Sequence, residues 1–321
     1  MKIRLKEIEI MKITFDTSAF WSTGMTYQEI YHTVAEAGYK YISPYNQDFP
    51  GFWTRPKYTK DEVLWHKKAI EREGLQIASL TTGFRIQHED EFMRQYAVDC
   101  WKKMFDIGEM MGVTVFNTEL GCGRDNPELH EAKLMKSLDE LVPILEKRGM
   151  RLDIQAHPDD FREHNDDAYD IVRYYDSPAL GYLYSIPHTF HYSDGKGDVE
   201  RMLKYDRRHL KHIIVADTYN YTKLFRYNIN PSGYYENGTV RCHAHIGEIG
   251  SGDVPFDRIF KTLRSFGFGA EEDTIATFNP LGFPERAIPD GIHTRRILEK
   301  ELLGRRDGYT EQEEDYGMYA R

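Results

Sequence analysis

One alternation runs through the whole sequence: a short run of apolar or β-branched residues ends in polar residues, a helix-length amphipathic stretch follows, and the pattern occurs eight times. Strands that alternate with helices pair in parallel, and eight such units favour a closed barrel over an open sheet. The sequence therefore predicts an α/β fold, a (β/α)8 barrel. Its expected strands are about 13–16, 39–43, 76–80, 113–117, 151–155, 180–186, 212–216 and 273–278.

Residue pairs at the expected helix starts agree with this alternation. Thr26 with Glu29, and Thr59 with Glu62, have the spacing of a capping box, in which each side chain bonds the other residue's backbone N–H. An Asn-Pro pair at 126–127 is typical of a helix cap followed by the first helical turn. Each pair lies between two expected strands, where a crossover helix belongs.

The chain has 321 residues, a length that one α/β barrel with decorated ends can fill. We expect one domain over 1–321, with a barrel core at about 11–303. Residues 304–321 are charged and tyrosine-rich without helical periodicity, which predicts a tail or a docking segment for another subunit. Residues 1–10 are either an added strand or the product of a start upstream of Met11.

A long insertion follows the seventh expected strand, from about residue 218 to residue 257. Loops of this length in a compact domain are usually functional or disordered. Because the insertion leaves a strand at its carboxyl end, we predict that it covers the barrel mouth as a lid. Tyr234, Tyr235 and His245 are the side chains expected to approach a substrate.

Composition excludes several partners. The formal net charge of −10, without a basic stripe, argues against binding to a nucleic-acid backbone. No apolar run approaches the roughly 20 residues of a membrane span, and the charged start does not resemble a signal peptide, so a cytoplasmic protein without membrane contact is expected. Phosphate-loop and dinucleotide-binding motifs are missing, which predicts that no nucleotide cofactor is used. The three cysteines are too scattered for a disulfide framework or a thiolate metal site.

Polar side chains follow the expected fourth and fifth strands. Alternation places Glu119 on the same side as residues 113, 115 and 117, so its carboxylate can point into the mouth and act as a ligand or general base. Asp153, Gln155 and His157 share one face of the fifth strand. Asp153 lies deepest and needs a structural partner, because a buried charge is costly when unpaired. His157 has an imidazole suited to proton transfer near neutral pH.

Further polar residues stand after the later strands. His188 and His191 flank Thr189-Phe190, and His188 is the better candidate for the pocket because it follows Pro187 at the strand end. Asp217 is either a substrate ligand or a loop cap. His243 and His245 point the same way if extended, which suits a metal or an oxyanion. Asn279 and Arg286 follow the last strand, and Trp53 lies in an aromatic loop after the second strand; all three have groups that can bind a sugar.

Five motifs carry a family resemblance: LDIQAHPDDF at 152–161, PHTFH at 187–191, VADT at 215–218, NP at 230–231 and HAH at 243–245. Through them the chain resembles the sugar phosphate isomerase/epimerase superfamily of xylose isomerase-like TIM barrels, and within it the inositol-catabolism branch called IolH, over about 11–303. The resemblance implies carbohydrate or polyol substrates and enediolate chemistry assisted by a divalent metal such as Mn²⁺ or Mg²⁺. Some relatives are the barrel subunit of a two-subunit lyase that cleaves C-glycosides, which implies an oligomer with a small second subunit.

The resemblance also shows a departure. In metal-dependent members Glu, Asp, His and Glu at the ends of strands five to eight hold the ion, and here these positions are Gln155, Ser185, Ile214 and approximately Thr277. An isoleucine cannot coordinate a metal, and neutral ligands hold a divalent ion poorly. Either the metal site has moved toward other side chains at the mouth, or the barrel works without metal.

These observations favour an enzyme that removes a proton α to a carbonyl of a sugar, an inositol derivative or a glycoside and stabilises the enediolate. His157 is the expected base or acid and Glu119 its counterpart. The expected metal ligands are Glu119, His188 and His245. The expected substrate-binding residues are Gln155, His191, Asp217, His243, Asn279 and Trp53. Two alternatives remain: a C-glycoside lyase subunit, and a barrel that has lost catalysis and binds a sugar or serves as a scaffold.

Overall fold

A computed structural model describes residues 11–21, 23–45, 59–158, 160–192, 197–218, 222–223, 235–236, 239–241, 245–270, 273–281 and 284–304. Several expectations lie outside these residues: those for the two terminal segments 1–10 and 305–321, and those for Trp53, Tyr234 and His243. The side chains of His191 and Tyr235 lie outside them too. No helix of the described part of the chain is long and apolar enough to cross a membrane.

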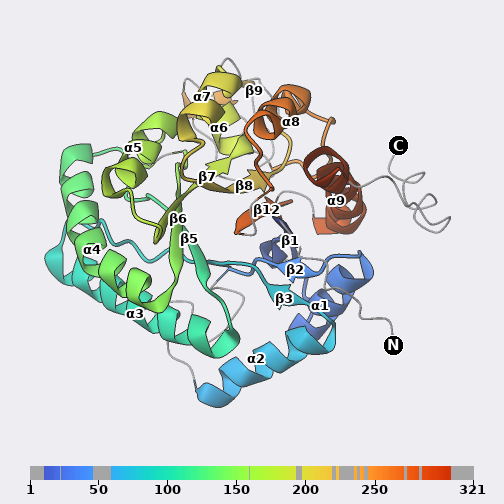
Figure 1. Ribbon diagram of the computed structural model, residues 1–321, viewed down its shortest axis with the longest axis horizontal. Helices are drawn as coiled ribbons and strands as arrows, with labels where there is room; N and C mark the ends of the chain where they lie inside the picture. The colour runs from blue at the N-terminus through green and yellow to red at the C-terminus, as the bar shows by residue number, and fades with distance from the viewer. Residues whose placement is uncertain are drawn as a thin grey trace.

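The predicted (β/α)8 TIM barrel is confirmed, with its parallel strands at the centre of the molecule and its helices around them (Figure 1). The sheet order is β3-β2-β1-β12-β8-β7-β6-β5-β4. β3 pairs with β2 and β4 pairs with β5, so the expected third strand is interrupted in the middle and forms two short strands. The strands are β1 Met11–Phe15, β2 Tyr41–Ile42, β3 Gln76–Ile77, β4 Leu80–Thr81, β5 Val115–Glu119, β6 Arg151–Gln155, β7 Leu180–Ser185, β8 Leu210–Val215 and β12 Thr274–Phe278.

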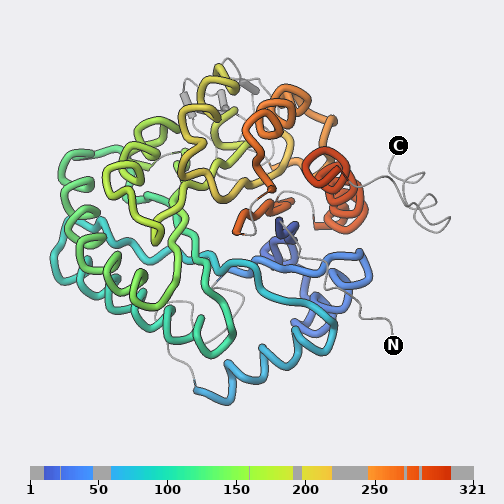
Figure 2. The backbone as a smooth tube through the Cα atoms, in the orientation of Figure 1, coloured from blue at the N-terminus to red at the C-terminus, as the bar shows by residue number. Residues whose placement is uncertain are grey.

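Helices connect the strands and cover the outside of the barrel. They are α1 Tyr27–Glu36, α2 Lys60–Arg72, α3 Glu91–Met111, α4 Pro127–Arg148, α5 Asn165–Tyr175, α6 Ile186–Tyr192, α7 Val199–Asp206, α8 Phe256–Ser265 and α9 Ala287–Leu303, with short 3-10 helices η1 Thr17–Phe20 and η4 Pro284–Arg286. Both predicted capping boxes, Thr26 with Glu29 and Thr59 with Glu62, are formed. The blue start and the red end of the chain lie side by side, where α9 packs on β1 (Figure 2).

The insertion after β8 contains a small antiparallel sheet in the order β10-β11-β9. Its strands are β9 Thr222–Lys223, β10 Tyr235–Glu236 and β11 Thr239–Arg241. The chain then returns to the barrel, where Ile246 pairs with Asp217 directly after β8. This return brings His245 back to the end of the barrel from which the insertion leaves.

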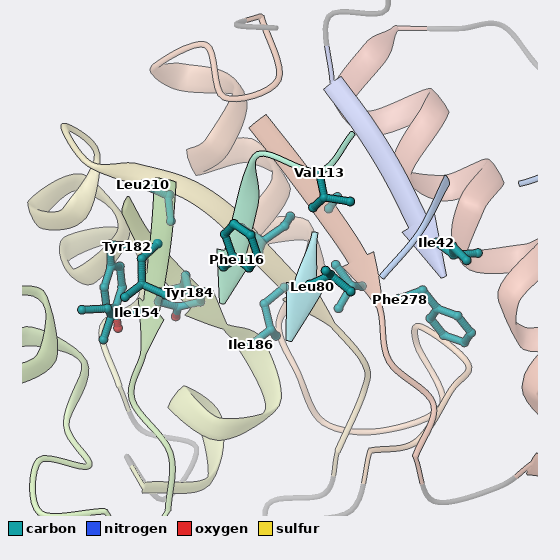
Figure 3. Close-up of a cluster of buried hydrophobic side chains, with 14 of the residues drawn as sticks. Ile42, Leu80, Val113, Phe116, Ile154, Tyr182, Tyr184, Ile186, Leu210 and Phe278 are labelled. Atoms are coloured by element: carbon teal, nitrogen blue, oxygen red, sulfur yellow. The ribbon is translucent and has the colours of Figure 1, made fainter. Parts of the chain in front are cut away.

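The main apolar core lies between the strands and the surrounding helices. Phe116 of β5 is fully buried against Trp101 and Phe105 of α3, and Phe15 packs edge-on against Phe278. Figure 3 shows side chains from successive strands, Phe116, Ile154, Tyr182 and Phe278 among them, within this core. Because side chains alternate along a strand, the neighbours of these residues point into the barrel.

The barrel interior is polar at its centre. Arg151 Nε and Nη2 donate to the two carboxylate oxygens of Asp153 at 2.7 and 3.1 Å, and His212 Nδ1 lies 3.4 Å from Asp153 Oδ2. His212 Nε2 is 2.6 Å from Thr277 Oγ1. Although burial opposes ionisation, the Arg151 guanidinium keeps the pKa of Asp153 below its usual value. The expectation that Asp153 has a structural partner is confirmed.

Three local expectations were wrong. The expected fourth strand is shifted by two residues, so Glu119 ends β5 instead of following it. Ile186 is the first residue of α6, although we expected it to end a strand. Pro187 suits the first turn of a helix, where its missing N–H leaves no hydrogen bond unmade. Asn126 takes a left-handed conformation and makes no side-chain cap bond; its amide donates to Glu89 instead.

Candidate active site

Four of the predicted side chains meet at the carboxyl ends of the strands. Glu119 ends β5, His157 follows β6, His188 lies on α6, and His245 is brought in by the returning insertion. His157 Nε2 is 3.9 Å from Glu119 Oε1, and the rings of His157 and His188 have centroids 4.6 Å apart in an edge-to-face arrangement. His188 Nε2 is 3.1 Å from His245 Nε2. Segments far apart in sequence thus place one carboxylate and three imidazoles in a continuous cluster.

Each of these imidazoles turns its Nδ1 atom toward a carbonyl oxygen. His157 Nδ1 lies 2.6 Å from Pro158 O, His188 Nδ1 lies 3.2 Å from Ala156 O, and His245 Nδ1 lies 2.8 Å from Asn279 Oδ1. A carbonyl oxygen only accepts, so Nδ1 carries the hydrogen in all three rings. For a neutral His157 ring the lone pair is therefore on Nε2, whereas one of the two Nε2 atoms of His188 and His245 carries a hydrogen to donate to the other.

Asn279 is a positioning residue for His245. Its Nδ2 donates to Asp16 Oδ2, which fixes the amide so that Oδ1 faces the imidazole. Asp16 is itself held by accepting the backbone N–H of Ser18 at the start of η1. Burial lowers the pKa of His245 to about 4. The structure thus uses Asn279, which we expected to bind substrate, to orient a ring at the mouth.

Two residues that the sequence did not single out complete the charge pattern. Arg85 Nη1 lies 3.9 Å from Glu119 Oε2, and Asp160 Oδ1 lies 4.0 Å from His157 Nδ1. Burial, together with the charge of Glu119, raises the pKa of Asp160 to about 7 against the opposing influence of His157 and Arg85. Arg85 lies directly against Gly121, where a Cβ would be 2.1 Å from its Nη1 atom. Both residues are in loops, where no periodic pattern marks a side chain's direction.

The interior beside this cluster contains buried polar atoms that find no hydrogen-bond partner among the described residues. They are Thr82 Oγ1, Asn117 Oδ1, Gln155 Oε1, Ser185 Oγ and Asp160 Oδ2. Gln155 is aligned with Glu119 in the β5-β6 register, and both Gln155 and Ser185 are only 2% exposed. Buried polar atoms in folded proteins are nearly always bonded. A ligand rich in hydroxyl groups would satisfy this set.

Asp217 and Arg286 are engaged elsewhere. The Asp217 carboxylate is fully buried and accepts backbone N–H bonds from Thr218, Gly250 and Gly252 at 2.8 to 2.9 Å. It therefore closes the base of the insertion and acts as a loop cap, one of the two roles that the sequence left open. Arg286 forms ion pairs with Glu248 at 2.8 Å and with Asp290 at 3.0 Å. We leave both out of the proposed substrate site.

Comparison with known proteins gives the chain its family. The model of the xylose isomerase-like TIM barrel family matches residues 31–293. The chain belongs to this family. A search of curated proteins found no match.

Solved structures share the fold of this xylose isomerase-like barrel at low sequence identity. The IolI protein with a bound zinc atom is 17% identical with a TM-score of 0.69, covering 91% of this chain and 99% of its own. The 3-keto-D-glucoside 4-epimerase YcjR of E. coli is 13% identical with a TM-score of 0.64, covering 89% and 99%. The probable 3-DHS dehydratase AsbF of Bacillus anthracis is 13% identical with a TM-score of 0.66, covering 92% and 100%.

The four positions at which the family resemblance implies a metal do not fit one in this xylose isomerase-like barrel. Ile214 pairs in register with Ser185 on one side and Thr277 on the other, so an apolar side chain stands in the middle of the set. The Thr277 hydroxyl is hydrogen-bonded to His212 Nε2. Gln155 and Ser185 supply two neutral oxygens, and a divalent ion bound by neutral oxygens alone is bound weakly.

Proposed function

We propose that this chain is a carbohydrate- or polyol-active enzyme that removes and returns a proton on the carbon next to a carbonyl group. The observation that carries the proposal is the pairing of His157 with Glu119 at the barrel mouth, where Nε2 lies 3.9 Å from Oε1. Buried polar atoms without hydrogen-bond partners among the described residues lie beside this pair and could bond to hydroxyl groups. Isomerisation and epimerisation both pass through the enediolate that such a proton transfer creates. Membership of the xylose isomerase-like family supports the same class of chemistry.

His157 is the proposed general base. Its Nδ1–H is held by Pro158 O, so the Nε2 lone pair is directed toward Glu119 and the mouth. When Nε2 takes the α-proton the ring becomes positively charged, and the Glu119 carboxylate stabilises that charge. The proton can then be returned to either carbon or oxygen of the enediolate. Arg85, on the other side of Glu119, helps to hold this carboxylate in place.

The substrate class follows from the polar atoms of the interior. Asn117 and Gln155 present amide oxygens, which accept from hydroxyl groups, and Ser185 can donate or accept. A polyhydroxylated molecule suits this surface, because hydroxyl groups can both donate to and accept from these side chains. YcjR, an epimerase of a 3-keto-glucoside, guides the choice of compounds to test.

The test is exchange of the α-proton with solvent. The purified protein is incubated in D₂O with a panel of ketohexoses, inosose and 3-keto-glucosides, and deuterium incorporation is followed by NMR. We expect exchange or epimerisation of at least one compound, and we expect His157→Asn to lower kcat by about 10² or more. The control is His293→Asn on the surface of α9, which should keep full activity and the same melting temperature.

Other outcomes would redirect the assignment. Release of the aglycone from an oxidised C-glycoside would identify the lyase reading, with a partner subunit then sought by co-purification. Binding of a sugar without any exchange would identify a barrel that has lost catalysis, the reading that Ile214 at a former metal position favours. Full activity in His157→Asn would show that this imidazole is structural.

A further inference from the structure

We propose that Arg85 is the electrophilic catalytic residue of the proposed reaction. Its guanidinium binds the carbonyl oxygen of the substrate and stabilises the negative charge that this oxygen gains in the enediolate. The inference rests on the proposed function and adds a second reacting side chain to His157. It gives an arginine of this chain the role that the family resemblance implied for a divalent metal.

The proposed reaction needs a positive charge beside the carbonyl oxygen. When His157 takes the proton from the neighbouring carbon, the electron pair of the broken C–H bond moves into the carbonyl group and its oxygen becomes an oxyanion. The family's metal positions cannot supply this charge here, because Ile214 is apolar and the Thr277 hydroxyl is already hydrogen-bonded. In the described part of the chain, no group of three or more His, Cys, Asp or Glu could hold an ion. A fixed cation at the mouth can supply the charge instead.

Arg85 lies beside the proposed base. Its Nη1 is 3.9 Å from Glu119 Oε2, and His157 Nε2 is 3.9 Å from Oε1 of the same carboxylate. The guanidinium and the imidazole therefore flank one carboxylate, the first from the loop after β4 and the second from the loop after β6. In an α-hydroxyketone the carbon that loses the proton is bonded to the carbonyl carbon. A substrate at the mouth can thus present the proton to His157 and the oxygen to Arg85 at the same time.

The donors of Arg85 are not used up by the fold. At 3.9 Å its contact with Glu119 is longer than a hydrogen bond, and the buried Nη1 atom has no hydrogen-bond partner among the described residues. Arg124, on the loop after β5, instead donates to Glu163 at 2.8 Å. Buried N–H groups in folded proteins are nearly always bonded. The side chain of Arg85 is 41% exposed, so a substrate oxygen can reach it and form a charge-assisted hydrogen bond.

The guanidinium keeps its charge in this environment. Burial opposes that charge, but the neighbouring Glu119 and Asp160 raise the pKa of Arg85. A guanidinium is protonated throughout the neutral pH range, so it neither accepts nor releases a proton during the reaction. Arg85 therefore acts through charge and hydrogen bonding, and His157 alone moves the proton.

Gly121 makes room for the guanidinium. A Cβ on Gly121 would lie 2.1 Å from Arg85 Nη1 and 2.6 Å from its Cζ, so the side chain packs directly on the loop that follows Glu119. Gly121 has a φ of +70°. Gly123 has a φ of +72°, but a Cβ at that position would meet nothing within 4 Å. The two glycines share a backbone conformation and differ in their contact with Arg85, which makes them a matched pair for mutation.

The first test measures turnover of any compound that exchanges its proton in D₂O. Arg85→Ala should lower kcat by about 10² to 10³ and change KM less, because the lost interaction is strongest in the transition state. Millimolar guanidinium chloride should restore part of this activity, because the free cation can occupy the vacated space. Arg85→Lys keeps the charge without the planar fork and should recover activity only in part. The control Arg124→Ala should keep the wild-type kcat.

The glycine pair tests the position of the guanidinium without removing it. Gly121→Ala should displace Arg85 and lower kcat by about tenfold to a hundredfold. Gly123→Ala imposes the same backbone strain and should lower the melting temperature by a similar amount, with kcat unchanged. A kcat loss in Arg85→Ala that guanidinium does not restore and that Gly121→Ala does not reproduce would mean that Arg85 only supports Glu119, and the inference would be wrong.

The second test needs no turnover. Threonohydroxamate, whose planar hydroxamate group resembles an enediolate, is titrated by calorimetry into the full chain after treatment with a chelator. Arg85→Ala should weaken its binding by about tenfold to a hundredfold, the worth of one hydrogen bond to a charged group. Arg124→Ala should bind it as the wild type does. If Arg85→Ala does not fold, Arg85→Lys carries both tests.

The outcomes separate this inference from the proposed function. Wild-type kcat in Arg85→Ala overturns the inference and leaves the proposed function standing. So does activity that a chelator abolishes and Mn²⁺ restores, because a metal would then be the electrophile. A wild-type chain that does not bind threonohydroxamate, or binding that Arg85→Ala leaves unchanged, also overturns the inference. Arg85-dependent binding without proton exchange on any compound refutes the proposed function and leaves Arg85 as the oxyanion-binding residue of the mouth.

Discussion

At the residue scale, the partner of each histidine decides what that histidine can do. The mouth rings of His157, His188 and His245 face carbonyl or amide oxygens, which fix the tautomer without adding charge. His209, by contrast, has its Nε2 2.9 Å from the Asp176 carboxylate on the outside of the barrel. At His157 this tautomer places Nε2, the atom that would accept a proton, on the side of Glu119.

Asp206 offers a test of buried charge away from the mouth. It ends α7 fully buried, and among the described residues Asn165 Nδ2, at 2.7 Å, is the one donor to its Oδ2 atom. Burial raises the pKa of Asp206 to about 8. Between the usual carboxyl pKa and this raised value the folded chain holds a proton that the unfolded chain has lost. Stability contributed by this group is therefore lost as pH rises from about 4 to 8.

Asp206→Asn should remove that dependence, because an amide cannot ionise. We expect the melting temperature of the variant to match the wild type near pH 4 and to exceed it by roughly 2 to 5 °C at pH 8. Thermal unfolding followed by circular dichroism across this range provides the measurement. Asp167→Asn, at an exposed position of α5, is the control and should leave the pH slope as it is. A constant difference between Asp206→Asn and wild type at every pH would show that burial does not shift this carboxyl.

Strand alternation allowed the direction of several mouth residues to be predicted from sequence. The odd-numbered positions of β5 and β6 bring Glu119 and Gln155 side by side, as their spacing indicated. Strand alternation could not predict the hydrogen-bond partner of each side chain. Asp217 stands at a strand end like Glu119, yet it serves the backbone of a loop that returns more than thirty residues later. A long-range contact of this kind has no local signature.

At the scale of elements, the position of β5 depends on its close packing against α3. Gly108 of α3 faces Phe116 of β5, and a Cβ on Gly108 would lie 2.4 Å from Phe116 Cζ. The helix can therefore rest directly on the ring, between Trp101 and Phe105. Since β5 ends in Glu119, this packing sets the height of the carboxylate at the mouth.

Gly108→Ala sets two effects against each other. Alanine favours a helix over glycine by about 1 kcal/mol, whereas overpacking a buried contact costs about 1 to 3 kcal/mol. Phe116 is fully enclosed and has no free space to retreat into, so the second effect should win. We expect Gly108→Ala to lower the free energy of unfolding by about 1 to 2 kcal/mol in urea titrations. In the Phe116→Leu background the same change should cost less or become favourable, and an equal cost in both backgrounds would contradict the contact.

Element boundaries followed from sequence only where capping chemistry marks them. The capping boxes at Thr26 and Thr59 start their helices as expected, because the pattern is local and complete. The break in the third strand, between β3 and β4, left no such mark. Neither did α6, because an apolar residue before Pro187 suits the end of a strand as well as the start of a helix.

At the scale of the whole molecule, the barrel separates the residues that hold it together from those proposed to act. The ion pair of Arg151 and Asp153 lies at the start of β6, and Arg151 also donates to Asp273 Oδ2 at 2.9 Å and to Asp273 O at 3.0 Å, ahead of β12. Side chains from β6, β8 and β12 thus meet inside the barrel. The mouth lies at the other end of the same strands, which is the usual division of labour in this fold.

Arg151→Met tests that separation. Removing one partner of a buried pair leaves the other charge uncompensated, so we expect the free energy of unfolding to fall by about 3 to 5 kcal/mol. The exposed pair of Arg173 with Asp170 provides the control, and Arg173→Met should cost less than about 1 kcal/mol. Adding Asp153→Leu to Arg151→Met should recover part of the lost free energy of unfolding, because it removes the unpaired carboxylate.

Below the unfolding transition, the rate of proton exchange per folded molecule of Arg151→Met should stay within about twofold of wild type, since the mouth keeps its geometry. A variant that remains stable but exchanges slowly would mean that Arg151 acts on the mouth through the interior network, and the division between the two ends of the barrel would have to be abandoned.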